Sequence, residues 1–373
     1  MSFKNGMNPE AKRFGNGVKF ISVMDILNNQ FIYYDNIRAS VEIADGDLDT
    51  YGVKYGDILF QRSSETLEDV GQANVYLDSK PAVFGGFVIR GKSKGNYNPL
   101  FFRYLLTSPT VRKRVIVKGA GAQHFNIGQD GLSKVCIDIP CIKEQEKIAR
   151  LLALLDERIA TQNKIIEDLK KLKSAISKQV FAQEPNGWCR LDTLFSKGKA
   201  GGTPTSTNKE YYNGEIPFLS INDITKQGKY VRYTENHLSQ SGLENSSAWV
   251  VPKYSLIMSM YASVGLVTIN EIPTTTSQAM FAMQLKDKGL LDYLYYYLSY
   301  FKYRYIHKYL ETGTQSNINA DIIRGIMIPI YGHSRNMEIA STLQGIDVKI
   351  DNELSVLKLF NKQKNYLLSQ MFI

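Results

Sequence analysis

Two long segments of the chain carry apolar residues at alternating steps of three and four, which is the spacing of a heptad seam. The first, "KEQEKIARLLALLDERIATQNKIIEDLKKLKSAISKQVF", contains neither Pro nor Gly. The second, "EIASTLQGIDVKIDNELSVLKLFNKQKNYLLSQMF", lies close to the end of the sequence. We predict two long helices over residues 143–185 and 334–373, each with one apolar stripe that another surface must cover.

The two stripes match each other position by position at a constant offset, and the polar positions Asp156 and Lys173 fall on Asp347 and Lys364. The matched register favours two helices that pair antiparallel as a coiled coil, related by a twofold-like axis. About 40 residues at about 1.5 Å each give a rod of about 60 Å. The predicted seam consists of Ile148, Leu152, Leu155, Ile159, Ile166, Leu169 and Ile176 in the first helix, and of Ile339, Leu343, Ile346, Ile350, Leu357, Phe360 and Leu367 in the second.

The repeat extends back into the regions that precede each helix. "GNGVKFISVMDI" (15–26) is similar to "NGEIPFLSINDI" (213–224), and "FNIGQDGLSKVCIDIP" (125–140) to "SNINADIIRGIMIPI" (316–330). A repeat of about 190 residues is far longer than a solenoid unit, so each copy is a domain followed by a helix. Short β-rich runs separated by turn residues, with a few helical stretches, predict α+β domains. We expect a first domain at 1–142 and a second at 186–333.

Composition places the chain among soluble globular proteins, with 43% hydrophobic and 22% charged residues. No signal-peptide pattern opens the sequence and no apolar run reaches membrane-spanning length, so we expect a cytoplasmic protein. Three cysteines match neither a disulfide framework nor a zinc signature. The net charge of +9 favours a polyanionic partner.

The sequence offers little that could carry catalysis. Its four histidines stand apart from other metal ligands, and no nucleophile-elbow, zinc-protease or phosphate-loop motif is present. The repeated carboxylates have structural positions: Asp25 and Asp223 follow a strand and suit a cap, while Asp156 and Asp347 lie beside the helix seam. We therefore predict no catalytic residue, no bound metal and no cofactor in this chain.

The tandem order of these motifs resembles the specificity subunits of type I restriction-modification systems. The resemblance rests on the paired helix starts "EQEKIARLLALLDERI" and "NMEIASTLQGIDVKI", on "GGTPTSTNKEYYNGEIPFLSINDI" (201–224) and on "GTQSNI" (313–318). It implies two target recognition domains that each recognise one half of a split, asymmetric DNA sequence. It also implies that the helices set the spacing and dock two modification (methyltransferase) subunits, which would carry S-adenosylmethionine, and that a restriction and translocase subunit joins the larger complex.

Side chains for base and phosphate contacts are expected in polar loops near strand ends, and Arg62 in "LFQRSSE" is the leading candidate. The candidates of the first domain are Lys12, Arg13, Lys19, Arg62, Ser63, Arg90, Lys92 and Lys94. Those of the second domain are Thr203, Thr205, Lys209, Tyr211, Arg232, Tyr233, Tyr261 and Gln278.

Two other function classes remain open at this point: a scaffold that docks two partner copies without base recognition, and a diverged DNA methyltransferase or nuclease.

The two copies of the repeat also differ at one place, because residues 188–199 have no counterpart before Phe3. A start further upstream, a trimmed chain, or a variant without this edge element would each account for the difference.

Overall fold

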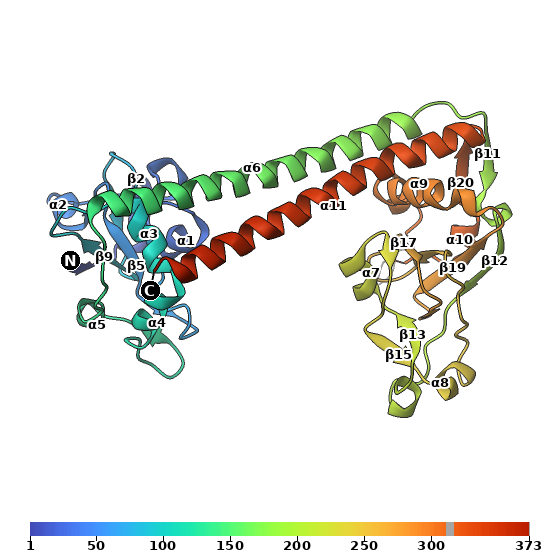
Figure 1. Cartoon of the computed structure of the whole chain (residues 1–373), viewed down its shortest axis with the longest axis horizontal. Coiled ribbons are helices and arrows are strands. Elements are labelled where there is room, and N and C mark those ends of the chain that lie inside the picture. The colour runs from blue at the N-terminus through green and yellow to red at the C-terminus, as the bar shows by residue number, and fades with distance from the viewer. Residues whose placement is uncertain (311–316, 373) are drawn as a thin grey trace. The chain divides into compact units, whose positions relative to one another are not determined.

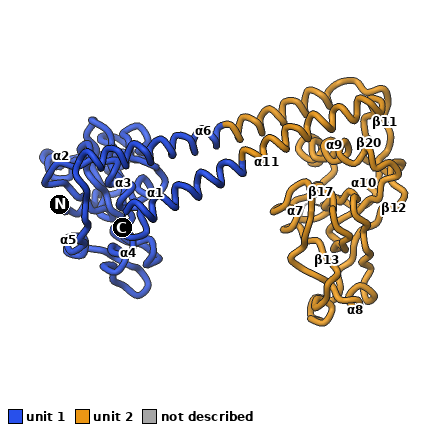
Figure 2. The backbone as a smooth tube through the Cα atoms, in the orientation of Figure 1, with its two compact units in different colours: residues 1–164, 354–373 blue, residues 165–353 orange. Residues whose placement is uncertain are grey.

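The computed structural model describes residues 1–310 and 317–372, which form two compact units. Unit 1 comprises residues 1–164 and 354–373, and unit 2 comprises residues 165–353 (Figures 1 and 2). Each unit contains one globular domain together with one part of each of two long helices. The four-part division at 142, 185 and 333 remains an interpretation of the sequence.

The two long helices are α6 (Ile142–Phe181) and α11 (His333–Gln370), and both contribute to both units (Figure 2). In unit 1 the first part of α6 lies beside the last part of α11, and in unit 2 the last part of α6 lies beside the first part of α11 (Figure 1). The two segments therefore run antiparallel within each unit. Every residue of the predicted seam is buried or half-buried, as a shared apolar stripe requires.

Unit 1 is built on two four-stranded sheets and a short two-stranded one. The first sheet has the order β1-β9-β5-β7, and its strands are β1 (Ser2–Asn5), β9 (Val88–Lys92), β5 (Ile58–Gln61) and β7 (Ala73–Val75). The second has the order β3-β2-β8-β4, with β3 (Ala39–Val41), β2 (Phe14–Ile21), β8 (Ala82–Phe84) and β4 (Gly52–Val53). The short sheet pairs β6 (Ser63–Ser64) with β10 (Phe125–Asn126).

Short helices connect these strands. They are α1 (Val23–Asn28), α2 (Asp47–Tyr51), α3 (Pro99–Thr107), α4 (Pro109–Ile116) and α5 (Gln129–Ser133), with 3₁₀ turns η1 (Ala11–Arg13) and η2 (Tyr34–Asn36). Helices α1, α3 and α5 contact the first sheet, while α2 contacts the second. Helix α3 begins where "NPLFF" predicts a helix start, because the Asn98 side chain accepts a hydrogen bond from the N–H of Phe101.

Unit 2 has a related architecture, but its two larger sheets have five and three strands. Its main sheet has the order β12-β19-β16-β17-β14, with β12 (Phe195–Ala200), β19 (Met280–Leu285), β16 (Leu256–Ser259), β17 (Val267–Asn270) and β14 (Tyr230–Val231). The second sheet is β15-β13-β18, with β15 (Asn236–Leu238), β13 (Ile216–Leu219) and β18 (Thr275–Thr276). A further pair joins β11 (Gly187–Arg190) to β20 (Met327–Ile330).

The helices of unit 2 correspond in part to those of unit 1, with α9 in the place of α3. They are α7 (Ile221–Gln227), α8 (Gln240–Glu244), α9 (Leu291–Arg304) and α10 (Ala320–Arg324), with 3₁₀ turns η3 (Leu191–Thr193), η4 (Lys209–Tyr212), η5 (Lys288–Leu290) and η6 (Ile306–Lys308). None of the helices in the described part of the chain is both long and apolar enough to cross a membrane.

Each long helix joins the core of a domain rather than standing apart from it. In unit 1, Leu152 of α6 and Leu368 of α11 belong to the cluster built on β5, β9 and α3. In unit 2, Phe181 of α6 and Leu343 of α11 belong to the cluster built on β16, β19 and α9. Complete burial of one such leucine stabilises the fold by about 1.5–3 kcal/mol, so the helix pair and the domains stabilise each other.

The repeated aspartates Asp25 and Asp223 are helix caps, as the sequence predicts. Asp223 accepts hydrogen bonds from the N–H and the hydroxyl of Ser220, at 2.8 and 2.7 Å, and from the N–H of Glu235 at 3.0 Å. Asp25 accepts the equivalent two bonds from Ser22, both at 2.7 Å. Each aspartate thus closes a capping box at the start of a short helix.

We predict that Asp223→Ala lowers the free energy of unfolding by about 2 kcal/mol, because it removes a buried carboxylate that accepts hydrogen bonds from three donors. Asp25→Ala should lower the free energy of unfolding by less, since Asp25 accepts two of these hydrogen bonds and Asp223 accepts three. Urea denaturation of both variants checks the order. A loss for Asp25→Ala that equals or exceeds the loss for Asp223→Ala would contradict it.

Candidate nucleic-acid interface

Each unit has its own loop cluster at one end of its main sheet, after β5 in unit 1 and after β16 in unit 2. In unit 1 the N–H of Arg62 donates to the carbonyl of Phe87 at 2.9 Å, and the carbonyl of Arg62 accepts from the N–H of Ile127 at 2.9 Å. In unit 2 Met260 makes the equivalent bonds, from its N–H to Ala279 at 2.7 Å and from the N–H of Ile318 at 3.1 Å. These two backbone hydrogen bonds are thus duplicated, whereas the side chains of the cluster differ.

In unit 1 the cluster presents a positive and an aromatic side chain. The Arg62 side chain is exposed, and its guanidinium makes a long hydrogen bond of 3.4 Å to the carbonyl of Gly86. Ser63 lies on β6 and donates its hydroxyl proton to the amide oxygen of Asn126. Phe87 is 67% exposed beside Arg62, in the turn between β8 and β9. An exposed aromatic ring next to an arginine and two amide or hydroxyl groups suits contact with nucleic acid.

In unit 2 the same position carries a tyrosine and an amide. Tyr261 and Gln278 are exposed and lie on the two loops that the bond between Met260 and Ala279 joins. The following Ala262 and Ser263 both have left-handed φ angles, of 40° and 52°, which non-glycine residues rarely adopt. The Ser259 hydroxyl supports this turn by donating to the carbonyl of Ser263 at 2.8 Å. Such a constrained turn presents Tyr261 in a fixed position.

Three basic candidates of unit 1 lie on η1 and β2. Lys12 is exposed and pairs with exposed Glu10 at 2.8 Å. The Arg13 guanidinium donates to the carbonyl of Glu42 at 2.9 Å and to Asp47 at 3.2 Å. Lys19 donates to the carbonyl of Ile37 at 2.8 Å. Lys12 and its partner Glu10 are both exposed to solvent, whereas Arg13 and Lys19 are half-buried and bonded to the domain, so Lys12 is the most accessible of the three to phosphate.

The candidates on and after β9 differ in exposure. Arg90 is half-buried, and its guanidinium donates to the carbonyl of Gly52 and lies over the Phe84 ring, 5.4 Å from its centre. Lys92 and Lys94 are exposed. Arg90 thus supports the interior of unit 1, while the two lysines face solvent.

The remaining candidates of unit 2 form two groups apart from the loop cluster in sequence. Thr203, Thr205 and Lys209 are exposed around η4, while Tyr211 is half-buried and accepts a backbone bond from Ser239. Arg232 pairs with Glu271 at 2.7 Å, and neighbouring Tyr233 is 56% exposed. In the "GTQSNI" motif, residues 313–316 lie outside the described residues.

The sequence analysis missed Phe87 and the Ala262–Ser263 turn. "GGF" between two strands gives a weak signal for an exposed aromatic residue, because two glycines indicate a tight turn. Nothing in "MYASVG" predicts two consecutive left-handed residues, since neither is Gly, Asn or Asp.

On the long helices, Asp156 and Asp347 each connect three elements. In unit 1 the carboxylate of Asp156 on α6 accepts from the Lys364 ammonium of α11 at 2.5 Å and from the Tyr104 hydroxyl of α3 at 2.8 Å. Burial, followed by the hydrogen bond to Asp156, raises the pKa of Tyr104, so this hydroxyl stays protonated and donates. One carboxylate thus links both long helices to the domain.

Unit 2 repeats this cluster with the helices exchanged. Asp347 of α11 accepts from Lys173 of α6 at 2.5 Å and from the Tyr296 hydroxyl of α9 at 2.8 Å. Lys229, just before β14, extends the cluster, since it donates to the Tyr296 hydroxyl at 3.0 Å and pairs with Asp292 at 2.7 Å. Burial lowers the pKa of Lys229, an effect that Asp292 opposes. We call these two sets the Asp156 cluster (Tyr104, Asp156, Lys364) and the Asp347 cluster (Tyr296, Asp347, Lys173).

Within residues 1–310 and 317–372, no group of three His, Cys, Asp or Glu side chains is arranged to hold a metal ion. The described residues of the loop cluster have the geometry of a binding surface, with hydrogen-bond donors, acceptors and an aromatic ring, and none of them pairs a nucleophile with a base.

Comparison with known proteins identifies relatives of both halves. Residues 3–171 and 185–358 each match the family described as "Type I restriction modification DNA specificity domain". The chain is 26% identical over 178 residues to the MjaIX specificity subunit of Methanocaldococcus jannaschii, covering 46% of this chain and 40% of that protein. It is 22% identical over 382 residues to the HindI specificity subunit of Haemophilus influenzae, covering 81% of each. A putative MjaX specificity subunit of M. jannaschii is 26% identical over 338 residues, covering 83% of this chain and 76% of that one.

Solved structures of the same kind share the fold. The type I restriction-modification S subunit from M. genitalium superposes with a TM-score of 0.55 at 16% identity, covering 100% of this chain and 93% of the other. A chain from a study of complex assembly and conformational transition of the type I R-M system gives a TM-score of 0.59 at 16% identity, with 92% of each chain covered.

We predict that Lys364→Ala destabilises the protein by about 3 kcal/mol, because it leaves the Asp156 carboxylate, only 8% exposed, without its counter-charge. Lys173→Ala should cost less, since Asp347 is more exposed. Thermal and urea unfolding measure both. Exposed Lys362→Ala serves as the matched control, and a Lys364→Ala loss no greater than that of the control would contradict the assignment.

Proposed function

Because the chain belongs to the type I restriction modification DNA specificity family, we propose that it recognises a bipartite DNA sequence, with each domain reading one half. The duplicated loop cluster carries this proposal. Two backbone hydrogen bonds of the cluster are equivalent in both units, but Arg62, Ser63 and Phe87 stand where unit 2 has Met260, Tyr261 and Ala279. Similar scaffolds with unlike side chains suit two half-sites of different sequence, because direct readout depends on the side chains that reach the base edges.

The paired helices would act as the spacer between the two half-sites. Two linked modules gain affinity by effective concentration only when the linker matches the separation of their sites. The Asp156 and Asp347 clusters support this role, since each fixes both helices to one domain. The number of undefined base pairs between the half-sites would follow from the helix pair rather than from either domain.

Other subunits of the restriction-modification complex would supply the chemistry. We propose that two modification subunits dock on the helices and carry S-adenosylmethionine, and that a restriction and translocase subunit joins the assembly. Exposed apolar side chains on the helices favour docking, because the contact would remove them from water. In unit 1 they include Leu151 and Leu154 of α6, which are 48% and 51% exposed, and in unit 2 they include Leu172 and Val348.

We predict that Arg62→Ala relaxes discrimination at one base pair of one half-site, by about 1–3 kcal/mol in binding free energy. Lys12→Ala, a matched loss of positive charge in the same domain, should weaken binding of all sequences about equally through a lost phosphate contact. Methylation mapping in cells that express each variant with its modification subunit measures the site preference.

The contrast between the two variants is the decisive observation. Arg62→Ala methylation confined to the wild-type motif would remove Arg62 from base recognition. If the Lys12→Ala variant loses discrimination at the same base pair, the change reflects a general loss of DNA affinity and not the loss of a base contact by Arg62.

We also predict that Leu151→Asp combined with Leu154→Asp weakens co-purification with the modification subunit by about tenfold or more, because two charges would enter an apolar contact. The fold should persist, since both side chains are already half in water. Exposed Glu157→Ala on the same helix is the control. Full complex formation by the double variant would place the docking surface elsewhere.

A further inference from the structure

Unit 2 has a groove of about 580 Å³ that is bordered by its parts of α6 and α11 and by α9, beside the Asp347 cluster. Helix α6 contributes lysine and serine side chains to the lining, α9 contributes tyrosines and Arg304, and α11 contributes Asp347 and Ile350. None of these described lining residues belongs to the loop cluster. Cations and aromatic rings in one hollow suit a ligand that carries negative charge beside flat or apolar groups.

The groove has more positive charge than its own carboxylate neutralises. Lys173 forms an ion pair with Asp347. Lys170, Lys178 and Arg304 also line the groove, are exposed, and form no ion pair within the described residues. Three exposed cations around one groove attract an anionic partner.

The α6 side of the groove is a single face of that helix. Lys170, Ser174 and Ser177 follow one another at steps of four and three, and Lys178 lies one turn after Ser174. At about 100° per residue, Leu172 lies about 200° around the helix from Lys170. A modification subunit that docks over exposed Leu172 therefore leaves the α6 side of the groove open.

The corresponding part of unit 1 lacks the lysines of this groove. At the constant offset of the repeat, Lys170 and Lys178 correspond to Asn361 and Ser369 of α11. The unit 1 cavity beside Asp156, of about 380 Å³, has neither lysine nor arginine in its described lining. The positive charge therefore comes from side chains specific to unit 2 and not from the shared helix pair.

The α9 side of the groove is also specific to unit 2. Helix α3 has 9 residues and α9 has 14, and Tyr104 and Tyr296 occupy the same place in each helix. The additional residues of α9 therefore lie at its C-terminal end. They include Tyr300, Tyr303 and Arg304, which line the groove.

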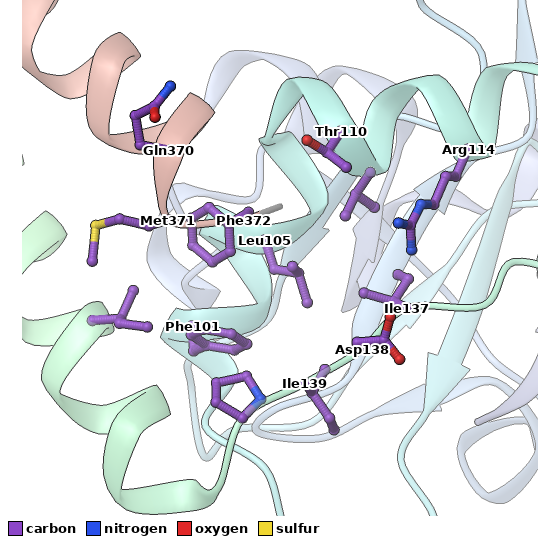
Figure 3. Close-up of a pocket in the computed structure, with 13 residues that line it drawn as sticks. Phe101, Leu105, Thr110, Arg114, Ile137, Asp138, Ile139, Gln370, Met371 and Phe372 are labelled. Atoms are coloured by element: carbon purple, nitrogen blue, oxygen red, sulfur yellow. The ribbon is translucent and has the colours of Figure 1, made fainter.

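Unit 1 has a cavity of another kind between its domain and the long helices. It has a volume of about 420 Å³ and lies between α3, α4, residues 137–140 and the end of α11 (Figure 3). Phe101 and Phe372 are on its wall, and Arg114 is the one cation of its described lining. The Arg114 guanidinium donates to the carbonyl of Cys136 at 3.1 Å. This cavity thus resembles an apolar pocket more than a phosphate site.

The groove of unit 2 adjoins the loop cluster through the end of α9. The Lys302 ammonium lies 6.0 Å from the ring centre of Tyr303, which is 85% exposed. The stem of Lys302 packs against the turn at 261–265, since a Cβ on Gly265 would lie 3.3 Å from the Lys302 Cγ. Lys302 and Tyr303 therefore join the turn that presents Tyr261 to the groove.

Phosphates of DNA and carboxylates of a partner protein are the two kinds of anion that suit these cations. The chain belongs to a DNA specificity family, and the groove adjoins the loops proposed to meet DNA. Exposed Tyr303 adds a ring that can pack against a nucleotide. These observations favour DNA.

We propose that this groove binds the sugar-phosphate backbone of duplex DNA beside the half-site that unit 2 recognises. Lys170, Lys178 and Arg304 contact phosphate oxygens, and the Tyr303 ring packs against the sugars. Such contacts raise affinity and position the protein without reading bases, so the groove anchors one half-site only. The inference rests on the proposed function, because DNA is the ligand in both.

The test uses the complex of the chain with its modification subunit and two fluorescein-labelled duplexes, one that contains the mapped motif and one that lacks it. Fluorescence anisotropy at several KCl concentrations gives the affinity and its salt dependence. Lys178→Ala combined with Arg304→Ala should weaken binding of both duplexes by about tenfold. The slope of log affinity against log salt should fall in magnitude by about 2, because two phosphate contacts are lost.

Lys171→Ala combined with Lys288→Ala is the matched control. Both lysines are exposed cations of unit 2 outside the groove lining, so the control loses the same charge. It should keep the salt slope of the wild-type complex. Methylation mapping of both double variants should return the wild-type motif, since neither loses a base contact, and thermal unfolding verifies that both are folded.

Equal salt slopes for the groove variant and the control would overturn the inference and leave the proposed function intact. A changed motif in the groove variant would also overturn it, since the groove would then read bases. Loss of the modification subunit from that variant would assign the groove to a protein partner and contradict DNA as its ligand.

The wild-type complex separates failure of the inference from failure of the proposed function. Equal affinity for the two duplexes, with the difference in salt slope retained, would contradict bipartite recognition and support the groove as a phosphate site. A wild-type complex without affinity for either duplex would overturn both.

Discussion

The arrangement of each unit depends on one carboxylate that three elements share. Asp156 and Asp347 each accept a lysine from the opposite helix and a tyrosine hydroxyl from the domain. A helix seam made only of apolar side chains tolerates a slip of one heptad, whereas an ion pair with a third partner does not. The same number of residues separates Asp156 from Lys173 and Asp347 from Lys364, so both clusters specify the same register. The proposed spacer function requires such a fixed register.

Most of the fold was predictable because the sequence contains it twice. The heptad spacing predicted the long helices, and the paired aspartates Asp25 and Asp223 predicted helix caps that the structure confirms. The partners of Asp156 and Asp347 were not predictable, although the repeat aligned Lys173 with Lys364. Sequence spacing identifies a seam position, but it does not say which side chain approaches from a helix nearly two hundred residues away.

The candidate interface was less predictable than the fold. Arg62 stood out because a polar loop follows a strand, and that loop belongs to the duplicated cluster. Arg90 shows the limit of arguments from charge, since its guanidinium faces a carbonyl and an aromatic ring inside unit 1. The sequence around a basic residue near a strand end does not indicate whether its side chain faces solvent or the interior of the domain. Phe87 was missed because an exposed aromatic residue and a core aromatic residue look alike in sequence.

The central claim is that two unlike domains recognise two half-sites at a separation fixed by one pair of helices. Long-read methylation mapping of DNA from cells that express this chain with its modification subunit, against cells without the chain, tests it most directly. We predict one new motif with two short, different halves around an undefined gap of constant length. A continuous motif, two identical halves, or a gap of variable length would contradict the account.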